Sequence, residues 1–248
     1  MFMSVVAPVP GVSVHPELAG IRVLLTGLDR ETGVDVARAF ADHKVRLVLQ
    51  SADSSPAVTE LVSVLALTAA EIRFFNEPIG TDPVRFAQTA VQAFGGLDAV
   101  VNLISFTADE IAGLAGLSSV EDLVADKLAT AVHITRVAAN RMSLTWTEGS
   151  ILNAVLMPAP TTAREAALAG YVRTTLAAVT KGEAQAVAER AVRVNAIGPR
   201  SLLGEERAGA HLSTGPEIAS LALHLASRKG RQLSGHMFDA EQVVLRGC

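Results

Sequence analysis

Residues 18–27 read Leu-Ala-Gly-Ile-Arg-Val-Leu-Leu-Thr-Gly, in which glycine precedes and follows a short apolar run. A run of this kind is typical of a strand that is buried on both faces of a parallel sheet. Similar runs recur along the chain. The sequence predicts seven strands: Ile21–Thr26, Val45–Gln50, Glu71–Phe75, Ala99–Leu103, Ser150–Val155, Val192–Ala196 and Gly235–Phe238.

Segments with helical periodicity lie between these strands. The predicted helices are Thr32–Asp42, Pro56–Leu67, Pro83–Ala93, Val120–Met142, Ala163–Glu189 and Pro216–Ser227. Alternation of strands and helices predicts right-handed βαβ units. The predicted fold class is therefore α/β, with a single-domain, doubly wound parallel sheet and helices on both faces. Ligands bind such sheets at the carboxyl ends of the strands.

The composition excludes several classes of protein. A net charge of −4 argues against a nucleic-acid partner. Cys248 is the only cysteine, which rules out an internal disulfide and a cysteine-rich zinc site and fits a cytoplasmic location. Charges and prolines interrupt every long apolar stretch, so no membrane span is expected. Residues 1–17 lack a basic start and contain three prolines, which predicts an N-terminal arm rather than a signal peptide.

Five landmarks, in order and at the right spacing, resemble the short-chain dehydrogenase/reductase family. They are residues 18–27, Gly95–Asn102 (GGLDAVVN), Gly149–Asn153 (GSILN), Arg193–Pro199 (RVNAIGP) and the last helix and strand, residues 216–239. The resemblance implies a Rossmann-like domain over residues 18–248, an NAD(P) cofactor and oxidoreductase activity. Because fold does not fix function, each part of the expected site is judged separately.

The family's nucleotide loop has the pattern Thr-Gly-x-x-x-Gly-x-Gly, and residues 26–33 read Thr-Gly-Leu-Asp-Arg-Glu-Thr-Gly. Gly27 and Gly33 are kept, but Glu31 stands in place of the middle glycine. Glu31 adds bulk and, if it points inward, negative charge beside a phosphate; if it points outward, it meets the helix N-terminus favourably. The family's Asn-Asn-Ala-Gly motif here reads Asn-Leu-Ile-Ser from Asn102. We therefore expect weak or absent dinucleotide binding.

The resemblance also implies which residues would hold a nucleotide: Gly27, Arg30, Gly33, Ser51, Asn102 and Pro199. In the family, a basic residue at the position of Arg30 binds the 2′-phosphate of NADP, although a solvated surface role fits Arg30 equally well. Ser51 stands where an acidic residue would hold the ribose of NAD. If the chain binds any dinucleotide, the sequence favours NADP over NAD.

The family's chemistry uses an asparagine, a serine, a tyrosine and a lysine four residues after the tyrosine. Ungapped counting from residues 149–153 and 193–195 places these four positions at Lys127, Leu156, Ala169 and Arg173, respectively. None of the family's four residue types is present there. The sequence therefore names no catalytic residue and leaves open whether the chain is an enzyme.

An alternative alignment places Tyr171, the only tyrosine in the chain, at the family's tyrosine position. Residues 169 and 171 of a helix point about 200° apart, so the two alignments exclude each other. In that alignment the lysine position falls on Thr175, so no cation lies four residues after the tyrosine. A tyrosine without a nearby cation has a pKa of about 10, which is too high for acid–base catalysis at neutral pH. A packing or subunit-contact role for Tyr171 is favoured.

Three functions remain open from the sequence. The first is a non-catalytic family member that acts as a binding or oligomeric subunit. The second is an active NADP-dependent oxidoreductase with an atypical acid–base group. The third is a non-redox enzyme that uses Arg173, because haloalcohol dehalogenases resemble this family and use a Ser–Tyr–Arg set. No metal site is expected, since His133, His211, His224 and His236 lack metal-binding spacing.

The expected partner is a second copy of the same chain. In the family, the long helices after the fourth and fifth strands form the subunit interface, and here these helices lie near residues 120–142 and 163–189. Both are rich in Ala, Val and Leu, so we expect a dimer or tetramer. The segment Arg200–Gly215 is shorter than the family's usual substrate lid, which weakens protection of a reaction site from water.

Overall fold

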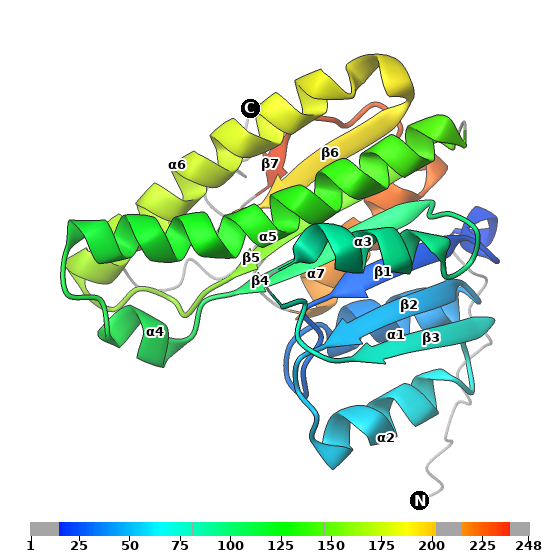
Figure 1. Cartoon of the computed structure of the whole chain (residues 1–248), viewed down its shortest axis with the longest axis horizontal. Coiled ribbons are helices and arrows are strands. Elements are labelled where there is room, and N and C mark those ends of the chain that lie inside the picture. Colours follow the sequence, from blue (N-terminus) through cyan, green and yellow to red (C-terminus); the bar gives the residue numbers. More distant parts are fainter. Residues whose placement is uncertain (1–14, 81, 146, 202–214, 239–248) are drawn as a thin grey trace, which may run out of the picture.

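The computed structural model describes residues 15–80, 82–145, 147–201 and 215–238 (Figure 1). One parallel sheet forms its centre, with strand order β3-β2-β1-β4-β5-β6-β7. The strands are β1 (Arg22–Thr26), β2 (Arg46–Ser51), β3 (Glu71–Asn76), β4 (Ala99–Ser105), β5 (Gly149–Leu156), β6 (Val192–Ile197) and β7 (Met237–Phe238). The helices are α1 (Val34–Asp42), α2 (Pro56–Leu65), α3 (Pro83–Gln92), α4 (Ala108–Ala112), α5 (Leu117–Leu144), α6 (Ala163–Ala186) and α7 (Gly215–Ala226).

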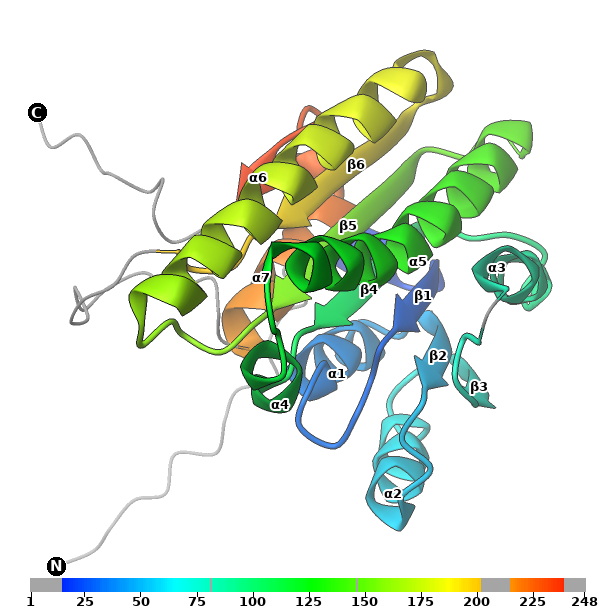
Figure 2. The ribbon, with the colours of Figure 1, turned by 60° about the vertical axis from the view of Figure 1, so that its left-hand side comes forward.

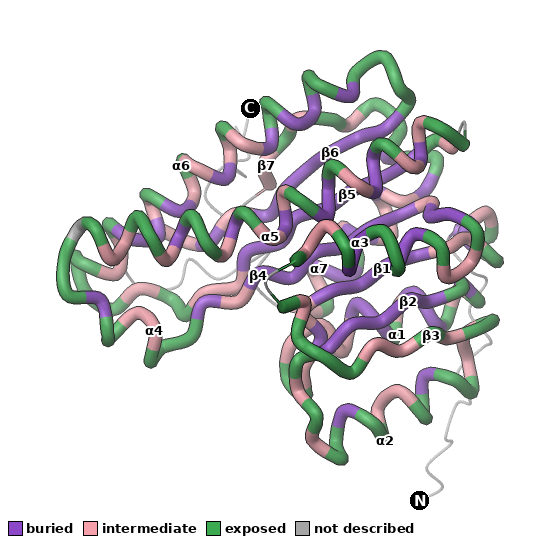
Figure 3. The backbone as a smooth tube through the Cα atoms, viewed as in Figure 1, coloured by how far each residue is buried: buried purple, intermediate pink, exposed green. Residues whose placement is uncertain are grey.

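Alternating side chains of the strands supply two layers of core. On β1, Val23 and Leu25 pack with α1, α2 and α7 on one face, whereas Leu24 packs with α3 and α5 on the other. Figure 3 shows the central strands as the continuously buried part of the chain, and Figure 2 shows the helices on either side of them. Burial on both faces explains why these strands are continuous apolar runs in the sequence.

A third group of buried residues extends beyond the sheet. It joins the ends of β4 and β5 to α4 and to the amino-terminal halves of α5 and α6. Phe106, Val124 and Val172 are among its fully or almost fully buried members. This group fixes α5 and α6 against the carboxyl ends of the strands, where ligands bind in sheets of this kind.

The predicted fold class is confirmed, including a seven-stranded parallel sheet with helices on both faces. Most predicted ends lie within two residues of the observed ones, and α5 begins three residues before its predicted start. The last strand contains only Met237–Phe238, and α6 ends at Ala186, before a separate 3-10 turn at Ala188–Arg190. The short helix α4 was not predicted.

The predicted N-terminal arm meets the domain at its last residues. Pro16–Leu18 form a 3-10 helix, and Leu18 is completely buried in the core. Residues 1–14 of the predicted arm lie outside the described residues, as do residues 202–214 of the predicted lid, including His211. Among the described residues, no helix is both long and apolar enough to cross a membrane, and no group of potential metal ligands is found.

The Arg-Val-Asn segment at residues 193–195 has a structural role at the opposite end of the sheet. The buried Arg193 guanidinium donates to the carbonyl oxygens of Leu225 at 2.8 Å and Gly230 at 2.6 Å. It thus provides a hydrogen-bond donor for a carbonyl group in the last turn of α7. Burial lowers the pKa of Arg193. The Asn195 side chain donates to Leu233 and accepts from the backbone of residue 236, which positions the last strand.

Candidate ligand site at the carboxyl ends of the strands

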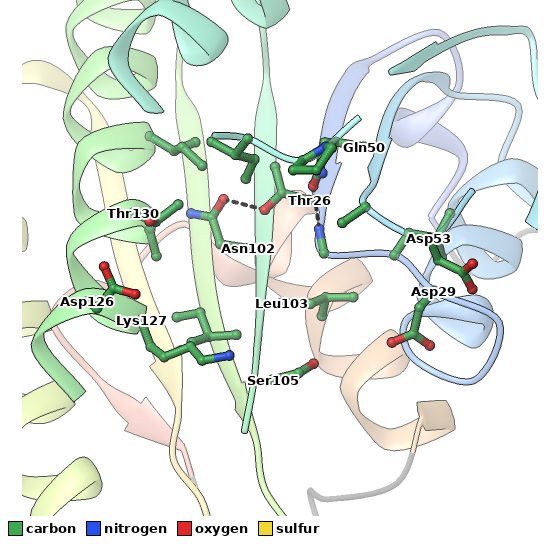
Figure 4. A pocket seen from close by; sticks show the side chains of 18 of the residues that line it. Thr26, Asp29, Gln50, Asp53, Asn102, Leu103, Ser105, Asp126, Lys127 and Thr130 are labelled. Carbon is green, nitrogen blue, oxygen red and sulfur yellow. Dashed lines mark hydrogen bonds between the residues drawn. The ribbon is translucent and has the colours of Figure 1, made fainter. Parts of the chain in front are cut away.

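A pocket of about 670 Å³ lies at the carboxyl ends of β1, β2 and β4 (Figure 4). Its apolar wall includes Leu103, Ile104, Leu123 and Ile134. Its polar side chains form two groups that face each other across the end of β4: Asp29, Gln50 and Asp53 on one side, and Asp126, Lys127 and Thr130 of α5 on the other. The pocket occupies the place where doubly wound sheets bind ligands.

Buried polar side chains join the strands beneath this pocket. Thr26 donates to Asn102 Oδ1 at 3.0 Å, and Asn102 Nδ2 donates to Asn153 Oδ1 at 2.8 Å. Thr135 of α5 also donates to Asn153, at 3.3 Å. Asn102 therefore has partners for both of its polar atoms within the fold, which accounts for an asparagine at this position without a ligand.

Gln50 holds the beginning of the loop between β1 and α1. Its side-chain oxygen accepts the Gly27 N–H at 2.9 Å, and its backbone oxygen accepts the Leu28 N–H at 3.1 Å. The amide nitrogen of Gln50 donates in turn to the carbonyl of Glu77 at 2.8 Å. The loop is thus tied to the ends of β2 and β3.

The rest of this loop folds around Asp29. The Oδ1 atom of Asp29 accepts the N–H of Glu31 at 2.7 Å and that of Thr32 at 2.5 Å. The Asp29 N–H donates to the Thr32 carbonyl at 3.1 Å. These bonds close the segment before α1 on itself, immediately beside the pocket.

Asp53 adds a second carboxylate on the same side of the pocket. The Ser55 backbone N–H, which donates to Asp53 Oδ1 at 2.8 Å, holds the pKa of Asp53 below its ordinary value, and the charge of Arg30 adds to this effect. Ser51, the predicted ribose position, is fully buried, and its hydroxyl accepts the Asp53 N–H at 3.0 Å. Ser51 therefore positions Asp53, and Asp53 is the residue that reaches the pocket.

Gly27 and Gly33 are required by packing as well as by conformation. Both have positive φ angles, of 76° and 81°. A Cβ on Gly27 would collide with the Leu103 carbonyl oxygen, and one on Gly33 would collide with the Leu103 side chain. Leu103, which is 7% exposed, fills the space beside both glycines.

Glu31 points away from the pocket. Its side chain is 80% exposed and pairs with Arg30 at 3.4 Å, and the Arg30 side chain is 68% exposed. Of the two orientations considered for Glu31, the structure has the outward one. Neither side chain is directed at a buried ligand position.

Lys127 lies at the opposite side of the pocket in an ion pair. Its Nζ atom is 2.6 Å from the Glu110 carboxylate and 5.9 Å from the centre of the Phe106 ring. Burial alone raises the pKa of Glu110, but the hydrogen bonds from Lys127 and the Thr107 N–H outweigh it, so the pKa is lowered. The Lys127 ammonium is therefore already neutralised by a partner within the fold.

The positions that correspond to the family's catalytic residues lie near the ends of β5 and β6. Leu156 pairs with Ser105 at the end of β5, and Ala169 on α6 is completely buried. Arg173 lies one turn beyond Ala169, against the backbone at Gly198, and its Nη1 atom donates to Ser201 Oγ at 3.4 Å. Pro199 follows β6 and is buried. Two of these positions therefore carry apolar side chains, and of the four only Lys127 lines the pocket of Figure 4.

Tyr171 lies on another face of α6. It is 39% exposed and lines a separate, mostly apolar pocket of about 740 Å³ between α4, α6 and the loop after β5. Arg164, Leu168 and Met157 line the same pocket, whereas none of the residues that line the pocket of Figure 4 does. Tyr171 therefore does not line the pocket of Figure 4.

A family model described as Enoyl-(Acyl carrier protein) reductase matches residues 27–210, which is more than half of the chain. The solved structures with the same fold include many short-chain dehydrogenases. The chain belongs to the short-chain dehydrogenase/reductase family.

A curated relative in this family is "Uncharacterized oxidoreductase MT0954" from Mycobacterium tuberculosis (strain CDC 1551 / Oshkosh). It is 29% identical over 238 residues, which cover 88% of this chain and 89% of the relative. A short-chain dehydrogenase from Mycobacterium smegmatis aligns with a TM-score of 0.71 and 20% identity, over 90% of this chain and 92% of that chain. The structure titled "NADH-dependent reductase A1-R' complexed with NAD" aligns with a TM-score of 0.69 and 18% identity, over 90% of this chain and 96% of that chain. At these identities the structural likeness shows the fold alone.

Short-chain dehydrogenases/reductases of Rossmann type place the dinucleotide pyrophosphate against backbone N–H groups at the start of the first helix. In this chain the N–H groups of Glu31 and Thr32, directly before α1, are bonded to the Asp29 carboxylate, and the Gly27 N–H is bonded to Gln50. The Asp29 carboxylate therefore already occupies donors at the start of this helix. The residues present therefore do not fit a pyrophosphate while the loop keeps this conformation.

Sequence reasoning missed Asp29 and Asp53, the two residues that define this side of the pocket. Both are aspartates that accept the N–H of a residue two positions later, a local turn typical of aspartate. The available signal in the sequence was an aspartate two residues before the donor, at Asp29 before Glu31 and at Asp53 before Ser55. The family pattern directed attention to Glu31 and Ser51 instead.

Proposed function

We propose that this short-chain dehydrogenase/reductase is a non-catalytic family member that acts in the cytoplasm as a binding or structural subunit. The observation that carries this proposal is the pair of apolar side chains, Leu156 and Ala169, at the family's serine and tyrosine positions. Hydride transfer to a carbonyl needs a group that polarises the oxygen and gives it a proton. Neither an isobutyl nor a methyl side chain does either.

Arg173 does not replace the missing acid. A guanidinium stays protonated at any pH at which the protein is folded, so it can orient an anion but cannot exchange a proton with a substrate. Its hydrogen bond to Ser201 supports a structural contact between α6 and the segment after β6. A non-redox reaction that depends on Arg173 would need a second group, and the alignment offers none.

The alternative is an active oxidoreductase. It is favoured by the family itself, by the oxidoreductase relative and by a pocket of about 670 Å³ that contains Lys127. The Lys127–Glu110 pair would have to supply the proton in place of the family's tyrosine. This activity requires NADH or NADPH to enter a pocket whose other side carries Asp29 and Asp53.

The two functions differ in a direct assay. We expect no oxidation of NADPH or NADH above background with a broad panel of aldehydes and ketones, at high concentration of the purified chain. Tyr171→Phe should leave that result and the unfolding midpoint unchanged, because Tyr171 lies outside the pocket of Figure 4. Turnover by the unmodified protein that Lys127→Met abolishes would establish the alternative, and turnover abolished by Tyr171→Phe would restore the second alignment.

A further inference from the structure

The loop between β1 and α1 bonds most of its own backbone donors within the chain. The N–H groups of Gly27 and Leu28 donate to the side chain and the carbonyl of Gln50, and the Asp29 N–H donates to the Thr32 carbonyl. The N–H groups of Glu31 and Thr32 donate to the Asp29 carboxylate. A loop that binds phosphate must instead leave several of these donors free for the ligand.

The Asp29 carboxylate lies where an anion is most favoured. The positive end of the α1 dipole and the free N–H groups of its first turn attract negative charge. The N-cap residue is Gly33, which has no side chain to satisfy these donors. The Asp29 carboxylate accepts the N–H groups of Glu31 and Thr32, the two residues directly before this N-cap, with short bonds of 2.7 and 2.5 Å. Charge-assisted hydrogen bonds of this length are among the stronger ones in proteins.

Leu103 completes the closed arrangement. Its side chain packs against Gly33 and its backbone against Gly27, so the loop lies in direct contact with β4 at both glycines. The loop is therefore supported by Asp29 from within and by Leu103 from below. Neither contact depends on a bound molecule.

We propose that Asp29 is a built-in ligand of this loop, whose carboxylate takes the place that a phosphate group takes in phosphate-binding loops of the same fold. The loop is thereby held closed without a dinucleotide, and phosphate-containing ligands are excluded by a group of the chain itself. This inference concerns binding and does not depend on whether the chain has a catalytic activity.

A simple turn-forming role for Asp29 makes a different prediction. If Asp29 only shapes the turn, its removal lowers stability and adds no affinity for anions. If its carboxylate stands in for a phosphate, its removal lowers stability and also frees donors that an added anion can satisfy. Binding measurements on folded variants therefore separate the two roles.

The test compares Asp29→Asn and Asp29→Gly with Glu31→Gln in the full chain. The control removes the same single charge from the same loop, but at a side chain that is 80% exposed and directed outward. Inorganic pyrophosphate and ADP, in metal-free buffer, are the probes, because they need only the loop donors and not the path of a nicotinamide. Binding is measured by isothermal titration calorimetry and unfolding by differential scanning calorimetry.

We expect no saturable binding of either probe to the unmodified chain or to Glu31→Gln at millimolar concentration. The Kd of Asp29→Gly for pyrophosphate should be at least roughly tenfold lower than the weakest Kd that the experiment can detect. Asp29→Asn should bind more weakly than Asp29→Gly but measurably. Both Asp29 variants should lose about 3–6 °C in Tm without ligand and regain part of it with pyrophosphate. In nitrogen-15 spectra, the Thr32 amide proton should shift upfield in Asp29→Asn while Glu31→Gln leaves it in place.

Two results would overturn the proposal. One is micromolar binding of pyrophosphate, NADH or NADPH to the unmodified chain. The other is a folded Asp29→Asn or Asp29→Gly variant that binds the probes no better than Glu31→Gln does. Asp29→Asn retains the size of the side chain, so it keeps the comparison decisive if Asp29→Gly does not fold.

Discussion

His15 is a buried titratable residue close to the start of the domain. It is 7% exposed, its ring centre lies 6.1 Å from that of His43, and its Nδ1 atom is 3.7 Å from Glu17. Burial lowers its pKa from 6.5, and the charges of Lys229, His43 and His224 add to this effect, while Glu17 opposes it. Folding therefore favours the neutral imidazole.

A lowered pKa in the folded state fixes the sign of the pH dependence. The stability contributed by neutral His15 is complete above the unfolded pKa of about 6.5 and is lost as the pH falls through the lower folded value. We expect the free energy of unfolding, measured with urea, to fall between about pH 7.5 and about pH 5.5. His15→Gln should show a smaller fall, whereas the exposed His133→Gln should behave like the unmodified chain.

Arg22 and Asp98 form the best-connected ion pair at the residue scale. The Asp98 carboxylate accepts the backbone N–H, Nε and Nη2 of Arg22 at 2.7–2.8 Å, and these bonds raise the pKa of Arg22. Each side chain is about a quarter exposed. We expect Asp98→Ala to lower the free energy of unfolding by about 2 kcal/mol in chemical denaturation. Glu71→Gln, which breaks an exposed pair with Arg73, should change it by less than about 0.5 kcal/mol.

Residue-scale predictions from sequence succeeded where a residue's environment follows from its element. Ala169, Tyr171 and Arg173 were predicted to lie on one helix, and α6 contains all three. The contact of Arg173 with Gly198 was not predicted. Asp29 and Asp53 were missed because their local turns do not reveal that both loops lead to the same pocket. Side-chain periodicity carries no information about the paths of loops.

At the element scale, α6 begins at a complete capping box. Thr162 accepts the Glu165 N–H at 3.2 Å, and the Glu165 carboxylate accepts the N–H groups of Thr161 and Thr162, which completes a capping box. We expect Thr162→Ala to reduce the free energy of unfolding by about 1 kcal/mol in urea denaturation. Thr174→Ala, at an exposed position in the same helix, should change it by less than about 0.5 kcal/mol. Equal losses in both variants would contradict a capping role.

The elements themselves could be read from the sequence to within one or two residues at most ends. Central strands such as β4 and β5 are uninterrupted apolar runs because both of their faces are buried, and this signal does not depend on distant residues. The helix α4 was missed because Ala108–Ala112 is too short to show a period of 3.6 residues. Its capping box, Thr107 with Glu110, was the available signal.

At the scale of the whole molecule, α5 and α6 lie together on one face of the sheet (Figures 1 and 2). Arg136 of α5 donates to Glu183 of α6 at 2.6 and 2.9 Å, which ties the two helices to each other. Their exposed surfaces carry small side chains, including Ala125 and Ala129 on α5. Small residues let the backbones of two helices approach closely, and this arrangement suits a two-fold contact between copies of the chain.

The last prediction is that the chain is a dimer or tetramer that uses α5 and α6. Ala129→Glu and Ala178→Glu place a charge on the exposed surface of each helix, and burial of that charge in a symmetric contact is costly because every copy brings the same charge. Multi-angle light scattering at micromolar concentration should report an oligomer for the unmodified chain and a shift toward the 25.9 kDa monomer for these variants. Ala57→Glu, on the exposed surface of α2, should leave the mass unchanged. A monomeric unmodified chain would contradict the prediction. Dissociation by Ala57→Glu alone would place the contact elsewhere, because an interface on α5 and α6 should be sensitive to charges at residues 129 and 178 and not to one at residue 57.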